Sequence, residues 1–275
     1  MARSVSLKNL PDALRVEPRT HIDLRKVDAA ATFGHDKDSA GKAQAEREAR
    51  LTDLQERLWA EGKHALLIVL QGIDAAGKDG TISKVMDAFN PQGCSVTGFK
   101  VPTPFEARHD FLWRVHAATP AKGTVAIFNR SHYEEVLIVR VHGIIDETTW
   151  RRRYHAINDF EHHLTDEGTA IVKLFLYIDA DEQRERFQAR LDDPTKRWKF
   201  AKGDLEERKR WDDYIDAFND CLRETSTDVA PWYVIPANRK WFRNLAVSEI
   251  VTQALERLDP QYPPAEEGLD GLVVT

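Results

Sequence analysis

The sequence predicts an α/β fold in which a central, mostly parallel five-stranded sheet lies between two layers of helices. Five short apolar runs have the composition of buried strands, and the stretches between them repeat apolar residues with a helical period. With 275 residues, of which 42% are apolar and 31% charged, the chain can form one elaborated domain with a substantial core. This composition excludes a disordered or fibrous chain.

The strand candidates are apolar along most of their length, as is typical of strands buried on both faces. They are residues 64–71 (HALLIVLQ), 95–101 (SVTGFKV), 123–129 (GTVAIFN), 169–178 (TAIVKLFLYI) and 232–235 (WYVI). Apolar residues recur with helical spacing in residues 51–58, 82–89 and 150–164. Because strands alternate with helices along the chain, we expect a parallel sheet that is covered on both faces.

The two ends of the chain differ from this pattern. The first 41 residues mix Pro and Gly with charged residues, and the last residues contain Pro260, Pro263 and Pro264. We therefore expect an N-terminal arm over residues 1–41, one domain over residues 42–258, and a C-terminal tail over residues 259–275.

Charge and cysteine content limit the classes of partner and compartment. The formal net charge is −6, so an anionic partner has to bind a local positive patch. Cys94 and Cys221 lack metal-ligand spacing, which argues against a disulfide framework or a structural zinc site. The aliphatic run from Ala65 to Leu70 is too short to span a bilayer, and no apolar signal segment follows Met1. We expect a cytoplasmic protein without a membrane partner.

A glycine-rich segment directly follows the first strand candidate. Residues 72–81 read GIDAAGKDGT, which has the G-x-x-x-x-G-K spacing of a phosphate-binding loop (P-loop) that opens a helix. Backbone N–H groups and the positive end of the helix converge on a phosphate in such a loop, and the lysine adds charge at the outer phosphates. The alternative is a glycine-rich turn with a solvated lysine. The candidate phosphate contacts are Gly72, Ala75, Ala76, Gly77, Lys78, Asp79, Gly80 and Thr81.

Two departures from the usual motif concern a metal ion. Asp79 replaces the Ser or Thr that normally follows the lysine, and Asn129 replaces the carboxylate that usually ends the third strand. Asp74 is placed where a carboxylate could hold Mg²⁺ through water, although it could instead bond only to local backbone amides. Asn129 can still accept a hydrogen bond from metal-bound water. Asp74 and Asn129 are therefore the candidate metal ligands, and Glu134 or Glu135 could add negative charge.

Further cations are expected near the same edge of the sheet. Arg130 follows a strand at its carboxyl end, where open α/β sheets bind ligands, so it is a candidate phosphate contact; an ion pair with a nearby Glu is the alternative. Residues 184–210 contain ten Lys or Arg against six Asp or Glu, a net charge of +4. Cations alternate there with Trp and Phe, which favours a basic helical lid over a solvated amphipathic helix with inward aromatics. The candidate contacts in this lid are Arg190, Lys196, Arg197, Lys199 and Lys202.

Four segments together resemble the family-2 polyphosphate kinases, which are similar in fold to thymidylate kinase. The resemblance extends from about residue 50 to residue 258 and depends on residues 71–81, 128–133 (FNRSHY), 193–199 (DPTKRWK) and 230–238 (APWYVIPAN). It implies a P-loop kinase-like three-layer sandwich and a reversible, Mg²⁺-dependent transfer of the terminal phosphoryl group between inorganic polyphosphate and a nucleotide. ATP would form from ADP, and the Asn-Arg-Ser-His-Tyr-Glu version of the second segment resembles the subgroup that also accepts AMP.

The resemblance also implies roles for single residues. Asp74 matches the metal-associated aspartate of the loop, Lys78 the phosphate-bridging lysine, Arg130 the strand-end arginine, and Arg190 the arginine that enters the lid. These four residues are expected to be catalytic. Members of the family are commonly oligomeric, so we expect a homo-oligomer, and we expect no nucleic-acid partner. Two other functions stay open from the residues alone. One is an ATP-dependent nucleoside monophosphate kinase, and the other is a non-catalytic module that binds polyphosphate or nucleic acid through a degenerate loop.

Overall fold

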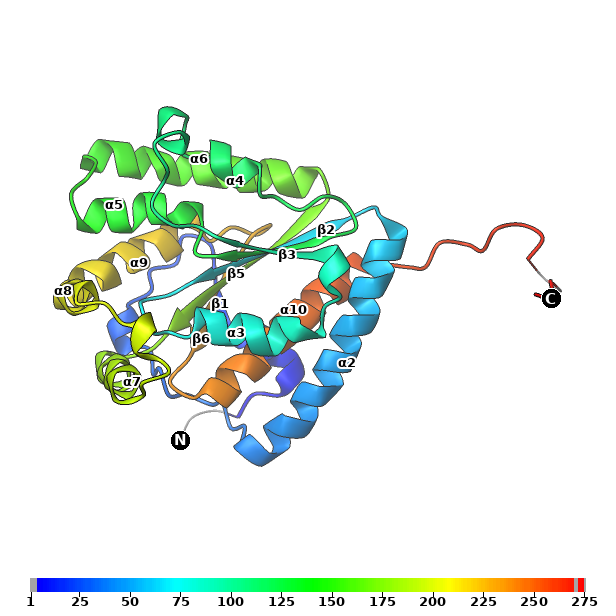
Figure 1. Cartoon of the computed structure of the whole chain (residues 1–275), viewed down its shortest axis with the longest axis horizontal. Coiled ribbons are helices and arrows are strands. Elements are labelled where there is room, and N and C mark those ends of the chain that lie inside the picture. Colours follow the sequence, from blue (N-terminus) through cyan, green and yellow to red (C-terminus); the bar gives the residue numbers. More distant parts are fainter. Residues whose placement is uncertain (1–3, 270–271, 275) are drawn as a thin grey trace.

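The computed structural model describes residues 4–269 and 272–274, and at its centre lies one sheet with the strand order β1-β6-β5-β2-β4-β3 (Figure 1). The strands are Arg15–Val16 (β1), Ala65–Gln71 (β2), Cys94–Gly98 (β3), Val125–Asn129 (β4), Thr169–Tyr177 (β5) and Trp232–Pro236 (β6). All neighbours in the sheet are parallel except β1 and β6, which are antiparallel.

The five predicted strands are β2 to β6, so the predicted parallel α/β sheet is confirmed. The predicted number of strands is one too small, because β1 was missed. β1 has two residues, which is too short to produce an apolar run in the sequence, and it pairs with β6 at the edge of the sheet.

Helices lie on both faces of the sheet (Figure 1). Those that the structure describes are α1 (Leu10–Leu14), α2 (Lys37–Glu61), α3 (Lys78–Val85), α4 (Trp113–His116), α5 (Ile138–Val141), α6 (Glu147–Asp166), α7 (Ala180–Asp192), α8 (Gly203–Lys209), α9 (Trp211–Thr225) and α10 (Lys240–Leu258). The helical period predicted for residues 51–58 and 150–164 is confirmed in α2 and α6. A 3₁₀ turn over Met86–Ala88 continues α3, so residues 82–89 are also largely helical.

The central strand supplies both hydrophobic cores. All seven residues of β2 are buried. Leu66, Ile68 and Leu70 belong to the core that also contains apolar residues of α2 and α10, whereas Leu67 and Val69 belong to the core that contains residues of α6 and α9. Because side chains alternate along a strand, one continuous apolar run can face two layers of helices.

The N-terminal segment packs on the domain. Leu10 and Leu24 are fully buried, and β1 extends the sheet. Helix α2 begins directly after Asp36, whose carboxylate accepts hydrogen bonds from two backbone N–H groups of the first turn. The boundary expected after residue 41 therefore falls within a helix. The described residues that follow α10, up to residue 269, extend away from the body (Figure 1). Within the described ranges, no helix is both long and apolar enough to cross a membrane.

The sheet topology brings three strand ends together. β2 lies between β4 and β5 and is parallel to both, so the carboxyl ends of these strands meet at one edge. The chain passes from β2 toward β3 on one side and reaches β5 on the other, which makes this edge a topological switch point, where open α/β sheets bind ligands. The loop after β2, the loop after β4 and helices α7 and α8 all lie there (Figure 1).

Candidate active site

The glycine-rich loop is a tight connection between β2 and α3. A side chain at Gly72 would bring its Cβ to 2.6 Å from the carbonyl oxygen of Leu176, which is backbone and cannot move away. Gly77 precedes the first residue of α3 and has a φ of 105°. A Cβ there would collide with the guanidinium group of Arg243. Gly72 is therefore needed for the close approach of two backbone segments, and Gly77 for its positive φ beside the Arg243 side chain.

Lys78, the first residue of α3, is buried and not solvated. Its exposed fraction is 9%, and its Nζ donates a hydrogen bond of 2.6 Å to the carbonyl oxygen of Gly72. Burial lowers the pKa of the ammonium group, and the nearby carboxylate of Asp74 acts in the opposite direction. The lysine is thus held across the mouth of the loop, where its charge is available to a phosphate.

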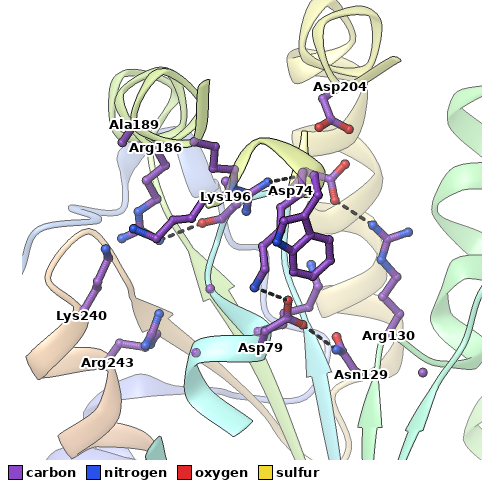
Figure 2. A pocket seen from close by; sticks show the side chains of 18 of the residues that line it. Asp74, Asp79, Asn129, Arg130, Arg186, Ala189, Lys196, Asp204, Lys240 and Arg243 are labelled. Carbon is purple, nitrogen blue, oxygen red and sulfur yellow. Dashed lines mark hydrogen bonds and ion pairs between the residues drawn. The ribbon is translucent and has the colours of Figure 1, made fainter. Parts of the chain in front are cut away.

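A cavity of about 780 Å³ opens between the loop, the ends of β3 and β4, the lid and the start of α10 (Figure 2). Nine Lys or Arg and three Asp line it, so the charge of its wall is strongly positive. The nine cations are Lys78, Lys100, Arg130, Arg186, Arg190, Lys196, Lys199, Lys240 and Arg243. A cavity of this composition is suited to a polyanion.

Arg130 and Asp74 form an ion pair on one side of this cavity (Figure 2). The Nη2 atom of Arg130 lies 2.7 Å from Oδ1 of Asp74. Burial alone would lower the pKa of Arg130, but the carboxylates of Glu134 and Asp74 raise it. Two residues that the sequence suggested for different tasks, a metal and a phosphate, are therefore in direct contact.

Asp79 connects three elements at the bottom of the cavity. The Nδ2 atom of Asn129, at the end of β4, donates a hydrogen bond of 2.9 Å to Oδ1 of Asp79. The Nζ atom of Lys199, in the lid, lies 3.9 Å from the second carboxylate oxygen of Asp79. The residue that replaces the usual Ser or Thr thus links α3 to β4 and to the lid (Figure 2).

Asp74 and Asn129 offer oxygen atoms to a divalent cation. Arg130 binds one carboxylate oxygen of Asp74, and the amide nitrogen of Asn129 faces Asp79, so each side chain keeps one oxygen outside these contacts. In the part of the chain that the structure describes, no group of three His, Cys, Asp or Glu residues could hold a metal. Mg²⁺ commonly takes one or two protein oxygens and completes its shell with phosphates and water, so these two residues fit it.

The lid consists of the end of α7, the 3₁₀ turn Arg197–Lys199 (η7) and α8. Phe200 faces inward and contacts Phe187, with ring centroids 5.4 Å apart. Trp198 is 78% exposed and lines the cavity. Arg190 donates a hydrogen bond of 3.2 Å to the carbonyl oxygen of Lys199, which holds the turn against α7. The aromatic residues of the lid therefore divide between its core and the site.

Several predicted residues lie outside the larger cavity. Thr81 is fully buried, and its hydroxyl donates to the carbonyl oxygen of Gly77 at 3.2 Å. Arg197 donates its Nε hydrogen to the carbonyl oxygen of Leu191 at 2.6 Å. Ala76 and Lys202 line neither cavity described here, and Gly72 and Glu134 line a second, smaller one. The remaining predicted residues line the larger cavity: Asp74, Ala75, Gly77, Lys78, Asp79, Gly80, Asn129, Arg130, Arg190, Lys196 and Lys199.

Arg186 was missed although it lies in the basic segment. One of its terminal nitrogens donates to the carbonyl oxygens of Ala75 and Ala76, at 2.9 and 3.0 Å, and the other donates to that of Ala237 at 2.6 Å. This side chain therefore fixes the P-loop to the end of β6. Its spacing from the loop, more than a hundred residues, gave no signal of this role.

Arg243 was also missed, because it belongs to α10 and no motif marks it. It is 3% exposed, and its Nε and Nη2 atoms donate to the amide oxygen of Asn244 at 3.1 and 2.8 Å. Burial and the neighbouring charge of Arg186 lower the pKa of Arg243 to about 10. A buried guanidinium that lies against Gly77 without a carboxylate partner among the described residues favours an incoming anion.

A second cavity of about 340 Å³ adjoins the first and shares Asp74, Arg130 and Asp204 with it. Gln183 in its wall donates to the carbonyl oxygen of Asp74 at 3.0 Å, and desolvation raises the pKa of Glu134 above its usual range. Six apolar or aromatic side chains also line it: Ile73, Leu137, Ile138, Trp211, Tyr214 and Phe218. This lining differs from that of the larger cavity and is suited to a flat, partly apolar group.

Comparison with known proteins gives a consistent result. Residues 34–263 match the family model of polyphosphate kinase 2. An AMP/ADP-polyphosphate phosphotransferase of Meiothermus ruber is 51% identical over 262 residues, which are 94% of this chain and 98% of that protein. An ADP-polyphosphate phosphotransferase of Rhodopseudomonas palustris is 49% identical over 78% of each chain. The crystal structure of polyphosphate kinase 2 from Arthrobacter aurescens TC1 matches with a TM-score of 0.93 and 46% identity, covering 97% of this chain and 96% of that one.

Proposed function

Because the chain belongs to the polyphosphate kinase 2 family, we propose that it transfers a phosphoryl group between inorganic polyphosphate and AMP or ADP. The names of its relatives, AMP/ADP-polyphosphate phosphotransferase and ADP-polyphosphate phosphotransferase, support both acceptors. One observation carries the proposal: two cavities of different chemical character meet at Asp74 and Arg130, beside the P-loop. An enzyme that brings a polyanion and a nucleotide together needs one positively charged cavity for the phosphates and one partly apolar cavity for the base and ribose.

Polyphosphate is assigned to the larger cavity. Polyphosphate carries about one negative charge per phosphate, and nine cations line this cavity against three aspartates. Lys240, Arg243 and Arg186 lie on one side of the P-loop, and Arg130 lies on the other (Figure 2). A polyphosphate that crosses the loop between these two sides would contact cations along its length and would present its terminal group near Arg130.

The nucleoside is assigned to the smaller cavity. Its volume of about 340 Å³ and its aromatic and aliphatic walls suit a base and ribose, whereas the larger cavity exposes mainly charge. The polar side chains of Gln183 and Tyr214 lie among these apolar walls and could fix the orientation of the ring. The phosphates of the nucleotide would then reach the shared boundary at Asp74 and Arg130.

The chemistry requires charge neutralisation and alignment. A nucleotide phosphate is already an anion near neutral pH, so its attack on the terminal phosphoryl group needs little general-base assistance. We assign Lys78 and Arg130 to the transferring group, and Arg190 closes the site from the lid. Divalent cations typically assist this family of phosphotransferases, and Mg²⁺ bound by Asp74 and Asn129 would neutralise part of the phosphate charge. The protein residues hold the two anions in line.

The direct test is ATP formation from ADP and long-chain polyphosphate, followed by luminescence and repeated with AMP as acceptor. Lys78→Ala is expected to lower kcat at least about a hundredfold, because a charge that stabilises the transition state is lost. Lys84→Ala is the matched control, since Lys84 is an exposed lysine of the same helix and lines neither cavity. Turnover of AMP with ATP as the only phosphate donor, and none with polyphosphate, would instead identify an ATP-dependent monophosphate kinase. Binding of polyphosphate without any turnover would identify a non-catalytic module.

A further inference from the structure

A fully buried network of charged and polar side chains lies behind the loop that carries Arg130. Lys173 of β5 is 0% exposed, and its ammonium group donates to Tyr133 Oη at 2.9 Å, to Glu161 Oε2 at 2.6 Å and to the carbonyl oxygen of Thr225 at 2.6 Å. The hydroxyl of Tyr133 in turn donates to Glu161 Oε1 at 2.7 Å. All three protons of the lysine are therefore bound.

Stability alone is a weak explanation for this network, even though its ionised groups stabilise one another. A buried ion pair loses so much hydration that apolar residues of similar volume often serve a fold equally well. The surrounding core is built from such residues, and β5 is otherwise apolar at its buried positions except for Thr169. A lysine in the middle of this strand therefore needs another reason, and its contacts point to the loop after β4.

The network holds the two residues that follow Arg130 and Ser131. Glu161 of α6 accepts from Tyr133, and its Oε1 atom lies 3.2 Å from Nε2 of His132. Because a carboxylate can only accept, the imidazole nitrogen is the donor. His132 and Tyr133 begin the 3₁₀ turn His132–Val136 (η6), so one carboxylate fixes both consecutive side chains at the start of this turn.

Arg130 itself needs such support. Its φ is 62°, a left-handed conformation that residues other than glycine keep only where their surroundings enforce it. Before Arg130 the loop is bound to the sheet, since the Arg130 N–H donates to the carbonyl oxygen of Leu70 at 3.1 Å and the Phe99 N–H donates to that of Asn129 at 3.2 Å. After Arg130 the buried network supplies the second anchor.

We infer that Lys173, Glu161 and Tyr133 are positioning residues that hold Arg130 in its active orientation toward Asp74 and the phosphate cavity. The inference rests on the phosphoryl transfer proposed above. None of the three side chains lines either cavity, so they act on substrates only through the loop. Loosening the network should lower kcat and leave substrate binding largely unchanged, because the rest of the phosphate and nucleoside contacts remain in place.

The mildest test is Tyr133→Phe, which removes the hydroxyl shared by Lys173 and Glu161 and keeps the ring. We expect kcat to fall about tenfold, with the KM values for ADP and polyphosphate within about twofold of wild type, because small misplacements of a reacting group cost rate steeply. Tyr154→Phe is the matched control. Tyr154 is also buried, lies on α6, and its hydroxyl has no hydrogen-bond partner among the described residues.

A double-mutant comparison separates positioning from a general loss of structure. In an Arg130→Lys background, Tyr133→Phe should lower kcat by a clearly smaller factor than in wild type, because its effect passes through the guanidinium group. Equal factors in the two backgrounds would overturn the inference. The pair Glu161→Gln and Lys173→Met, introduced together, removes both buried charges at once and should reproduce the loss of kcat even if Tyr133→Phe folds poorly.

Hydrogen exchange gives a readout that does not depend on activity. The amides of residues 129–136 should exchange faster in Tyr133→Phe than in wild type and should be unchanged in Tyr154→Phe. Unchanged exchange in Tyr133→Phe would overturn the positioning role. A wild-type enzyme that forms no ATP from polyphosphate, but whose loop still loosens in Tyr133→Phe, would contradict the proposed function and support the anchoring of Arg130.

Discussion

Arg130 and Arg243 are both guanidinium groups beside the P-loop, but their surroundings differ. Arg130 is paired with the carboxylate of Asp74 at 2.7 Å, whereas the guanidinium of Arg243 donates hydrogen bonds, within the described part of the chain, only to the amide oxygen of Asn244. An unpaired buried cation gains more from an incoming anion than one that is already neutralised. This difference between two residues predicts that Arg243 contributes mainly to the binding of polyphosphate.

Arg243→Gln tests this contribution. We expect the KM for polyphosphate to rise about tenfold, which corresponds to the loss of one charge-assisted hydrogen bond. The KM for ADP should change little, since Arg243 does not line the smaller cavity. Initial rates with each substrate varied in turn provide the measurement. Arg239→Gln is the control, because Arg239 directly precedes α10 and donates to the carbonyl oxygen of Ala30, outside the cavity.

An equal rise in both KM values would contradict this assignment, and so would an unchanged KM for polyphosphate. A large change in the Arg239→Gln control would indicate that the start of α10 had been disturbed in both variants.

Helix α7 positions the P-loop from the side. Asp179 caps its start by accepting a hydrogen bond from the Glu182 N–H at 2.8 Å, and its second carboxylate oxygen accepts from Nδ2 of Asn238 at 2.7 Å. The same helix carries Gln183 and Arg186, which both donate to backbone carbonyl oxygens of the P-loop. The cap therefore fixes the N-terminus of α7, and the geometry of the P-loop depends on this helix.

Asp179→Ala should lower the free energy of unfolding by about 1 kcal/mol, which is typical for the loss of a helix cap. It should also lower kcat, because the start of α7 is no longer anchored and this helix carries Gln183 and Arg186, which bind the P-loop. Asp181→Ala is the control on the same helix. Among the residues that the structure describes, the carboxylate of Asp181 pairs only with Arg184, at 3.2 Å, and such exposed ion pairs contribute little. Urea unfolding and initial rates measure both effects. Equal stability of the two variants would show that the cap does not hold α7.

Charge is separated across the whole molecule. The formal net charge is −6, yet nine cations and three aspartates line the larger cavity. A positive cavity in an otherwise negative surface concentrates an anionic substrate at one place and limits binding elsewhere. The homo-oligomer, the absence of a nucleic-acid partner and the cytoplasmic location remain predictions.

The stability of the whole fold should depend on pH through the buried network. Desolvation opposes the ionisation of Glu161, but Lys173 and His132 outweigh it and lower the pKa of this carboxyl below the ordinary 4.5. In the same cluster, burial lowers the pKa of Lys173 and raises that of Tyr133. As the pH falls through 4.5, Glu161 therefore takes up a proton in the unfolded chain at a higher pH than in the folded chain. The stabilisation is complete above this pH and is lost as the pH falls through the folded pKa.

We therefore expect the free energy of unfolding of the wild type to decrease more steeply with falling pH in this window than that of the Glu161→Gln and Lys173→Met double variant. Urea unfolding at a series of acidic pH values provides the comparison. Parallel curves for the two proteins would mean that Glu161 is not held as a carboxylate in the folded state.

Features that neighbouring residues encode could be predicted from the sequence alone. Continuous apolar runs predicted β2, β4, β5 and β6, because a strand buried on both faces needs apolar residues at every position. Strand β3 was also predicted, but its residues are half-buried or exposed, because it lies at the edge of the sheet. The P-loop and the basic lid could also be predicted, because each takes its characteristic residues from one short segment. The P-loop takes its glycines and its lysine from residues 72–78, and the lid takes its cations from residues 184–210. Lys78, Arg130 and Arg190 were accordingly predicted from their local motifs, and all three line the larger cavity.

Contacts between residues that are distant in the chain depend on the tertiary packing. Strand β1 exists because two residues pair with β6, and so short a contact leaves no periodic signal. Arg243 reaches the P-loop from α10, and Lys173 meets Glu161 and Tyr133 from three different elements. Burial and unpaired charge are properties of packing between segments, so local composition cannot encode them. The division into two cavities that join at Asp74 follows from that packing.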